Sequence, residues 1–473
     1  MFTFLDGPWK DWKLNENWDL CDSYSSSIFS PSDGLKPHII KATAKYRSRG
    51  RLPILSFFYR LNGSCISRCS QPNAGLLGKS CEEDQLYIKM VRESVSPGGN
   101  LLIFDARSSL AAAGNKFRGK GTEDLSNYPN CEMYFMDIEN IHAMRDSLEQ
   151  LRKIILSSGY SDVNWFQDLH STSWLRHIRA IIRAACRIAS QVHEKPTSLL
   201  VHCSDGWDRT AQLCSLAQLM LDPFYRTSKG FQILIDKEWM CFGHKFRDRL
   251  GYPLKPDERS PVFLQFLDCT YQLMSQFPTA FEFNDSYLIS IVDWIHTGWF
   301  GNFLSNSIKE ASENGLSSKT ASMWTFLDTM METGSARNSS YVASKSIEEG
   351  FLLPVANMKV FRFWANLYLR YDCSVLRSKV LSKSTLISED RSSRSKRSTE
   401  ADFDSKEAKS GATEEMDELQ SEMLVDDFEF NVDGDSSVQK ASFLVPFSSV
   451  STCFACQKPF DSIWERKKHC HIW

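Results

Sequence analysis

The chain has 473 residues, 42% of them hydrophobic, which is enough for one large globular domain with additional segments. Lys and Arg number 55 against 58 Asp and Glu, so the net charge of −3 excludes the global positive charge typical of nucleic-acid-binding proteins. The 14 cysteines follow no regular spacing, which favours reduced thiols in the cytosol over a disulfide framework.

Neither a secretory signal nor a membrane span is expected. The N-terminus carries Asp6, Lys10 and Asp11 where a signal peptide would need an apolar core. The most apolar late stretch, residues 287–304, is interrupted by Asp293 and His296. It therefore predicts a core helix rather than a membrane-spanning one.

Apolar patterns predict alternating strands and helices. Short apolar runs at 52–59 and 100–105 predict buried strands, and longer periodic patterns predict helices at 144–156 and 174–192. Ser173 is placed to cap the second of these helices. Residues 358–371 predict the last packed helix. The alternation predicts the α/β class, with a central sheet flanked by helices.

The most informative segment follows the second long helix. Residues 198–202 form an apolar run that predicts a buried strand, and helical spacing resumes from Thr210 until Pro223. Between them, Cys203 and Arg209 stand six positions apart with small and polar residues dominating the gap. A strand-to-helix loop of this kind directs backbone N–H groups and a helix N-terminus at a bound anion.

This arrangement predicts a cysteine-dependent phosphatase loop. Cys203 would attack phosphorus as the thiolate, which the positive helix end favours, and Arg209 would bind the phosphate oxygens. Cys241 and Arg247 repeat the spacing, but two phenylalanines between them argue against a tight cradle. The alternative interpretation of Cys203 is a buried structural thiol.

Residues 202–210 resemble the signature loop of the myotubularin phosphoinositide 3-phosphatases. The resemblance continues in segments 68–72, 137–142, 259–266 and 276–283, and covers roughly residues 7–373 in order. It implies a protein-tyrosine-phosphatase-like fold that removes the 3-phosphate from phosphatidylinositol 3-phosphate and phosphatidylinositol 3,5-bisphosphate. It implies no metal or organic cofactor for catalysis.

The resemblance also assigns catalytic roles. Cys203 forms a phosphocysteine intermediate, Arg209 stabilises the phosphate charge, and Asp208 protonates the leaving oxygen. The like charge of a bound phosphate should raise the pKa of Asp208 and help it hold that proton. Thr210 is expected to donate a hydrogen bond to the sulfur. Asp205 is expected to bind substrate hydroxyls or brace the loop.

Substrate-binding residues are expected in and around the loop. Two basic segments, 115–121 and 245–249, offer the positive charge that a polyanionic headgroup requires. By resemblance, Lys245 and Arg249 contact the second phosphate, although the family usually has arginine at the first of these positions. The full expected set is Asn115, Asn140, Ile141, Ser204, Asp205, Gly206, Trp207, Lys245 and Arg249.

The composition changes near residue 375, which predicts three regions: a phosphatase domain at 1–375, a disordered charged linker at 376–445, and a C-terminal segment at 446–473. The last resembles the opening of a FYVE zinc finger, with Cys453, Cys456 and Cys470 as an incomplete zinc-ligand set. Family members carry a PH-GRAM domain before the catalytic region, and it is expected to be missing here.

The expected partners are phosphoinositide lipids on membrane surfaces, with homo- or hetero-oligomers of myotubularins as a further expectation and no nucleic acid. The expected location is the cytoplasm, with peripheral association with endosomal or other internal membranes. Two alternatives remain open. One is a protein tyrosine or dual-specificity phosphatase using the same loop, and the other is a catalytically weak scaffold that binds an active myotubularin.

Overall fold

The computed structural model describes residues 9–12, 15–31, 35–156, 162–252, 256–344 and 350–371. Those up to Leu369 belong to one compact unit. The predicted linker at 376–445 and the predicted zinc ligands Cys453, Cys456 and Cys470 lie outside the described residues. In the described ranges, every helix is too short or too polar to cross a bilayer.

A five-stranded sheet organises the unit, in the order β3-β4-β7-β5-β6. β3 runs antiparallel to β4, and the other neighbours are parallel. The strands of this sheet are β3 (Ile54–Phe58), β4 (Cys65–Cys69), β5 (Leu101–Asp105), β6 (Cys131–Phe135) and β7 (Ser198–His202). A separate antiparallel pair joins β1 (Trp9–Trp12) to β2 (Ile28–Pro31).

Every residue of the central strand β7 is buried, as expected for a parallel strand covered on both faces. Leu199 and Val201 point into one hydrophobic core, and Leu200 points into the other. Side-chain alternation along the strand produces this division. The strands predicted at 52–59, 100–105 and 198–202 are confirmed as β3, β5 and β7, and β3 and β5 are shorter than predicted.

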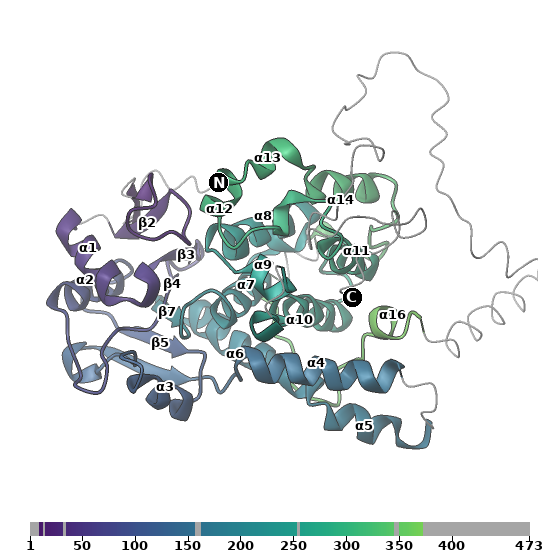
Figure 1. Cartoon of the computed structure of the whole chain (residues 1–473), viewed down its shortest axis with the longest axis horizontal. Helices are drawn as coiled ribbons and strands as arrows, with labels where there is room; N and C mark the ends of the chain where they lie inside the picture. The colour runs from purple at the N-terminus through teal and green to yellow at the C-terminus, as the bar shows by residue number, and fades with distance from the viewer. Residues whose placement is uncertain are drawn as a thin grey trace, which may run out of the picture. The chain divides into compact units, whose positions relative to one another are not determined.

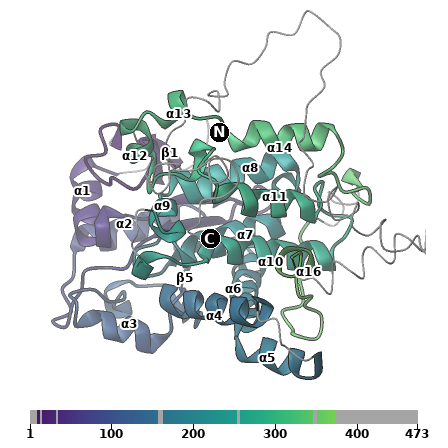
Figure 2. The same cartoon turned by 45° about the vertical axis from the view of Figure 1, so that its right-hand side comes forward.

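Helices cover the two faces of the sheet. α1 (Pro37–Tyr46) and α2 (Glu82–Glu93) pack on one side, and α6 (Trp174–Glu194) and α7 (Arg209–Leu221) on the other (Figure 1). α7 is buried from Thr210 to Leu221, because further helices enclose it. Figure 2 shows α8 (Ser228–Ile235), α11 (Asp285–Ile295) and α14 (Met323–Glu332) stacked beyond α7 and α10 (Val262–Gln276).

The remaining helices and several single turns complete the unit. They are α3 (Ser109–Lys116), α4 (Ile141–Leu156), α5 (Trp165–Ser171), α9 (Phe246–Leu250), α12 (Ile308–Glu313), α13 (Leu316–Lys319) and α16 (Ala365–Tyr368). The single turns are η2 (Ser48–Gly50), η3 (Leu125–Asn127), η4 (Asp162–Asn164), η5 (Pro223–Arg226), η6 (Asp236–Cys241), η7 (Pro256–Glu258) and η8 (Gly301–Phe303).

Three expectations about helices need correction. The helix predicted over 358–371 is wrong apart from α16, because the Gln272 side chain binds the backbone N–H and carbonyl of Arg362 and holds that segment non-helical. The helix expected over 287–304 ends at Ile295. Ser173 occupies the N-cap position of α6, but its left-handed backbone (φ 60°) leaves its side chain without a capping bond.

Candidate active site

The loop from Cys203 to Asp208 joins the end of β7 to the start of α7, as the sequence predicts. Cys203 follows His202, which pairs with Cys69 of β4 on one side and Asp105 of β5 on the other. The nucleophile candidate thus lies at the carboxyl end of the central strand. In open α/β sheets, this edge is where ligands bind.

The backbone of the loop is arranged for an anion. Among the described residues, no acceptor is present for the backbone N–H groups of Ser204, Asp205, Trp207 and Asp208. Gly206 has φ +78°, and a Cβ built on it would lie 2.1 Å from the Cys69 carbonyl oxygen. Only glycine fits this position, and the tight turn that it allows leaves several N–H groups available to one ligand.

The Cys203 thiol is 3% exposed and receives two hydrogen bonds. The Gly206 N–H donates to Sγ at 3.3 Å, and the Thr210 hydroxyl donates at 3.2 Å. Donors aimed at sulfur stabilise a negative charge on it, which suits a nucleophilic thiolate. By contrast, burial raises the pKa of Cys241 to about 11, so the second Cys-x5-Arg match has no such environment.

Arg209 begins α7 and is half-buried beside the loop. Its Nη1 donates to the Ile138 carbonyl at 3.0 Å, and its Nη2 lies 3.5 Å from the Ser204 hydroxyl. Its Nε is buried and has no partner among the described residues. The guanidinium is therefore held in place while keeping N–H capacity for an incoming oxyanion.

Asp208 is locked in an ion pair. Arg249 donates to both of its oxygens, from Nε at 3.0 Å and from Nη2 at 2.9 Å, and His244 Nδ1 lies 3.2 Å from Oδ1. Burial alone would raise the pKa of Asp208, but Arg249 and His244 outweigh it and hold that pKa well below its usual range. With Arg249 and His244 on its carboxylate, Asp208 is ionised. The raised pKa predicted from the sequence applies to Asp208 beside a bound phosphate, where the negative charge of the phosphate acts on it.

Asp205 and Ser204 are braced by the segments that precede β3 and follow β4. The Ser48 hydroxyl donates to Asp205 Oδ1 at 3.0 Å, and the Gln71 N–H donates to the Ser204 carbonyl at 3.0 Å. Arg107 in turn donates to Gln71 Oε1. These bonds favour loop bracing, one of the two roles expected for Asp205.

His202 belongs to a buried charged cluster behind the loop. Its Nε2 lies 3.2 Å from Glu123 Oε2 at ion-pair distance without hydrogen-bond geometry, and Glu123 also accepts from Arg47. Burial lowers the pKa of His202, but Glu123 and Asp105 reverse this and raise it overall. His202 Nδ1 lies 3.2 Å from the Cys203 carbonyl oxygen, so the cluster reaches the loop.

Trp207, a residue of the loop, is in contact with Lys245. The Lys245 ammonium lies 4.6 Å from the centre of the Trp207 ring, and 3.6 Å from Asp248 Oδ2. The Trp207 carbonyl lies 2.9 Å from His244 Nδ1. The structure therefore brings Lys245 and Arg249 to the same side of the loop, through Trp207 and Asp208.

The remaining expected pocket residues are less tightly connected to the loop. Asn140 is exposed and its side chain accepts from the backbone N–H groups of His142 and Ala143, so it caps α4, which begins earlier than the predicted residue 144. Ile141 accepts from Ser260 through its carbonyl. Asn115 donates to the Ala111 carbonyl within α3, and in the described ranges no hydrogen bond or ion pair joins it to residues 203–209.

Several residues around the loop were not expected from the sequence. Arg51, Arg68, His244, Glu123, Ser48 and Glu258 contact loop residues or their direct partners. Arg68 lies in one of the segments that carried the family resemblance, and His244 precedes the basic segment 245–249. Arg68 and His244 could therefore have been identified as site residues from the sequence, whereas no motif pointed to Glu123 or Ser48.

Comparison with known proteins agrees with this geometry. Residues 4–312 match the myotubularin-like phosphatase domain. The chain is 43% identical over 367 residues to mouse phosphatidylinositol-3,5-bisphosphate 3-phosphatase MTMR2, covering 77% of this chain and 56% of that protein. It is 41% identical over 370 residues to Xenopus tropicalis myotubularin, covering 78% and 60%. The chain thus spans about three-fifths of the length of these relatives.

The parallel sheet, the Cys-x5-Arg loop at its carboxyl edge and the helix behind it define the class of cysteine-dependent, protein-tyrosine-phosphatase-like folds. Within that class, the chain belongs to the myotubularin-like phosphatase family. Within the described ranges, no group of three or more His, Cys, Asp or Glu side chains is placed to hold a metal ion.

Proposed function

We propose that this chain is a phosphoinositide 3-phosphatase that acts on phosphatidylinositol 3-phosphate and phosphatidylinositol 3,5-bisphosphate. One observation carries the proposal: a thiol with two donors on its sulfur lies within a loop in which the backbone N–H groups of Ser204, Asp205, Trp207 and Asp208 have no acceptor among the described residues. The mouse relative is named as a 3-phosphatase of the bisphosphate, and this supports the choice of substrate.

The reaction proceeds in two steps on this loop. Cys203 Sγ attacks the 3-phosphate, so that an S–P bond forms as the P–O bond to inositol breaks. The loop N–H groups and Arg209 stabilise the charge on the phosphoryl oxygens. Asp208 gives its proton to the departing inositol oxygen. Water then attacks phosphorus and gives a proton to the Asp208 carboxylate, the S–P bond breaks, and phosphate and the Cys203 thiolate are released.

Asp208 can act as the acid only after its ion pair with Arg249 is loosened. A phosphate arriving beside Arg249 competes for the guanidinium, and its negative charge raises the pKa of Asp208. Lys245 adds a second cation on that side and is 30% exposed. Together, Lys245 and Arg249 are the groups that we assign to the second phosphate of the bisphosphate.

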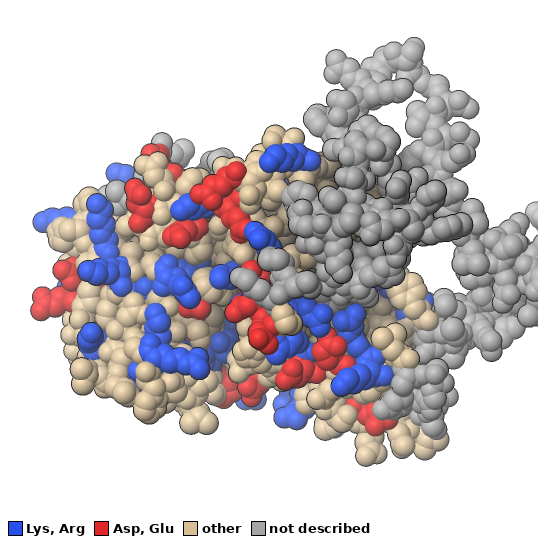
Figure 3. Space-filling view, viewed as in Figure 1, with Lys and Arg blue, Asp and Glu red and all other residues tan. Residues whose placement is uncertain are grey.

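Surface charge supports an anionic, membrane-bound substrate. Figure 3 shows Lys and Arg gathered with few acidic neighbours over the region of α1 and α3, whereas both signs alternate around α4 and α5. The exposed basic residues of this region are Lys41, Lys45, Arg49, Lys116 and Arg118. Such a field attracts anionic surfaces and is weakened by salt.

The broader organisation is also proposed. Residues 1–375 form the phosphatase domain, residues 376–445 a charged linker, and residues 446–473 a segment in which Cys453, Cys456 and Cys470 are candidate ligands for one zinc. The protein works in the cytoplasm at internal membranes such as endosomes, and associates with itself or with other myotubularins.

The test is phosphate release from four short-chain or soluble substrates: phosphatidylinositol 3-phosphate, its 3,5-bisphosphate, the 4-phosphate, and a phosphotyrosine peptide. Release from the 3-phosphorylated lipids alone, abolished by Cys203→Ser, is the expected result. Cys241→Ser is the matched control, because Cys241 has the same spacing to an arginine but lies in η6, and it should keep full activity.

The other outcomes separate the alternatives. Preference for the peptide would replace the lipid assignment with a protein phosphatase. A folded chain that releases phosphate from none of the substrates would favour the scaffold.

A further inference from the structure

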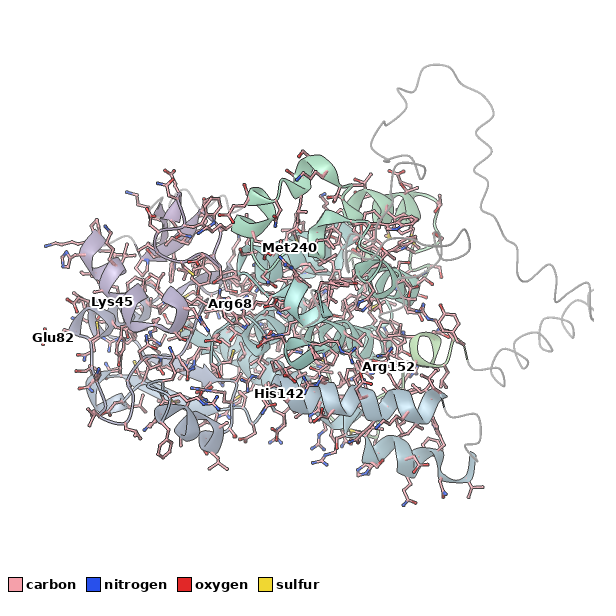
Figure 4. The ribbon with its side chains drawn as sticks, viewed as in Figure 1. Lys45, Arg68, Glu82, His142, Arg152 and Met240 are labelled. Atoms are coloured by element: carbon pink, nitrogen blue, oxygen red, sulfur yellow. The ribbon has the colours of Figure 1, made fainter. Side chains whose placement is uncertain are left out.

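The carbonyl of Gly206, in the middle of the catalytic loop, is bound by two buried arginines. Arg51 Nη2 donates to it at 3.0 Å, and Arg68 Nη2 donates at 2.7 Å. Both arginine residues are 0% exposed. In Figure 4, Arg68 lies farther toward the middle of the view than Lys45, which is near the left edge. These two donors use both lone pairs of the carbonyl oxygen, and both are charged, which makes the hydrogen bonds stronger than neutral ones.

This carbonyl sets the direction of the next N–H. In a trans peptide, the carbonyl and the following N–H point in opposite directions, so the Trp207 N–H is directed away from both arginines. That N–H has no acceptor among the described residues, while the N–H of Gly206 itself donates to Cys203 Sγ. Donors on the carbonyl also polarise the amide and strengthen its N–H as a donor.

The two arginines differ in their counter-charge. Arg68 is paired with the Glu238 carboxylate at 2.8 Å. Arg51 instead bonds only neutral oxygens besides Gly206, namely the Ser23 hydroxyl at 2.6 Å and the Phe242 carbonyl at 2.8 Å. Its guanidinium also lies 4.4 Å from the centre of the Tyr24 ring. In the described ranges, Arg51 has no carboxylate partner.

Burying a cation without a counter-ion is costly. An anion bound to the loop N–H groups of Ser204, Asp205, Trp207 and Asp208, which have no acceptor among the described residues, would supply that counter-charge. Arg51 is joined to this loop by its hydrogen bond to the Gly206 carbonyl, and its guanidinium lies 5.5 Å from the centre of the Trp207 ring.

We propose that Arg51 is a positioning residue for phosphate transfer, which with Arg68 holds the Gly206–Trp207 peptide so that the Trp207 N–H binds the transferred phosphoryl group. The charge of Arg51 is balanced by the phosphate itself. This inference rests on the proposed phosphatase function, and the test below separates the two.

The test is tungstate binding, measured by calorimetry, together with turnover of short-chain phosphatidylinositol 3-phosphate. Arg51→Lys keeps the charge but cannot bridge the three oxygens of Gly206, Ser23 and Phe242. We expect tungstate binding and kcat each to fall roughly tenfold or more, a smaller loss than the roughly 10²–10³-fold that follows outright removal of an oxyanion donor, because the Trp207 N–H itself remains. The matched control is Arg92→Lys, another buried arginine that binds a carbonyl, that of Pro129, away from the loop. It should stay within about twofold of the wild type in both measurements, as expected for a group outside the site.

A second readout is made on the wild-type chain and does not depend on an Arg51 variant. With 15N-labelled tryptophan, the backbone amide of Trp207, assigned with Trp207→Phe, should shift downfield on saturation with tungstate. An unshifted Trp207 amide, or a folded Arg51→Lys protein with wild-type tungstate affinity and kcat, would overturn the inference while leaving the phosphatase intact. A wild-type chain that neither binds tungstate nor releases phosphate would overturn the proposed function instead.

Discussion

Arg249 grips both carboxylate oxygens of Asp208, at 3.0 and 2.9 Å, and so holds the proposed general acid in its ionised form. The pair is buried, with the Asp208 side chain 10% and the Arg249 side chain 5% exposed. Arg249 also binds Glu258, through the carboxylate at 2.7 Å and the carbonyl at 3.0 Å. Asp208 can therefore hold a proton only when another anion draws Arg249 away from its carboxylate.

Arg249→Met should shift the pH profile of kcat, which reports the pKa of the acid in the enzyme–substrate complex. Without the guanidinium, His244 alone opposes the effect of burial, so the pKa of Asp208 rises and the alkaline limb should move up by about one pH unit or more. The measurement is kcat for the monophosphate between pH 5 and 9, and the readout is the pH at which the limb falls, not the maximal rate. Glu258→Gln is the control, because it removes the other carboxylate of Arg249 and leaves Asp208 gripped. A limb at the same pH in all three proteins would contradict this role for Arg249.

Asp208→Asn should reduce turnover of an inositol phosphate by about 10²–10⁴-fold, the usual contribution of a general acid. An aryl phosphate with an activated phenol as leaving group needs no such proton, so its turnover should fall much less. The comparison of the two substrates on wild-type and variant protein measures the acid role directly. Equal losses on both substrates would assign Asp208 a purely structural role through Arg249 and His244.

Gly206→Ala should abolish anion binding and destabilise the fold. Its Cβ would meet the Cys69 carbonyl oxygen at 2.1 Å, in addition to the strain of φ +78°. Gly63→Ala isolates the strain, because Gly63 has φ +79° with nothing within 4 Å of its Cβ, and should cost only about 1–2 kcal/mol. Urea unfolding at unchanged slope gives both free energies. Similar losses in the two variants would mean that the loop can move away from β4.

Glu123→Gln should destabilise the protein by about 3–5 kcal/mol, since it removes the buried carboxylate that faces His202 and one of the two that Arg47 binds, the other being Asp84. The loss depends on pH. The pKa of His202 is raised in the folded state, so its share of the stability is fully present below about pH 6.5 and is lost as pH rises through the folded-state value. The pKa of Glu123 is lowered, so its share is present above about pH 4.3 and is lost as pH falls.

The difference in unfolding free energy between wild type and Glu123→Gln should therefore be largest between about pH 4.5 and 6.5. Urea unfolding across pH 4 to 9 measures it. Glu132→Gln, an exposed carboxylate on β6, serves as control and should stay within about 0.5 kcal/mol of the wild type. A constant difference across the whole range would show that His202 is not charged by Glu123.

The sequence predicted correctly those elements whose pattern lies within one continuous segment of the chain. The run 198–202, the loop and the helix behind it are adjacent in sequence, and strand, turn and helix each leave their own period or punctuation. The last segment was not predictable in the same way. Residues 358–364 have helical spacing, but Gln272 on α10 binds their backbone, and no local pattern reports a partner about 90 positions away.

The sequence by itself predicted the candidate nucleophile, the candidate phosphate-binding arginine and the loop that joins them, because seven consecutive residues on a strand-to-helix turn bring their own geometry. Only the tertiary structure decided what controls that loop. Arg249 is 41 positions from Asp208, and Arg51 and Arg68 are 155 and 138 positions from Gly206. These contacts join residues that are far apart in sequence. They form only in the folded protein, where a buried charged group has lost its water and must be paired or hydrogen-bonded by other residues.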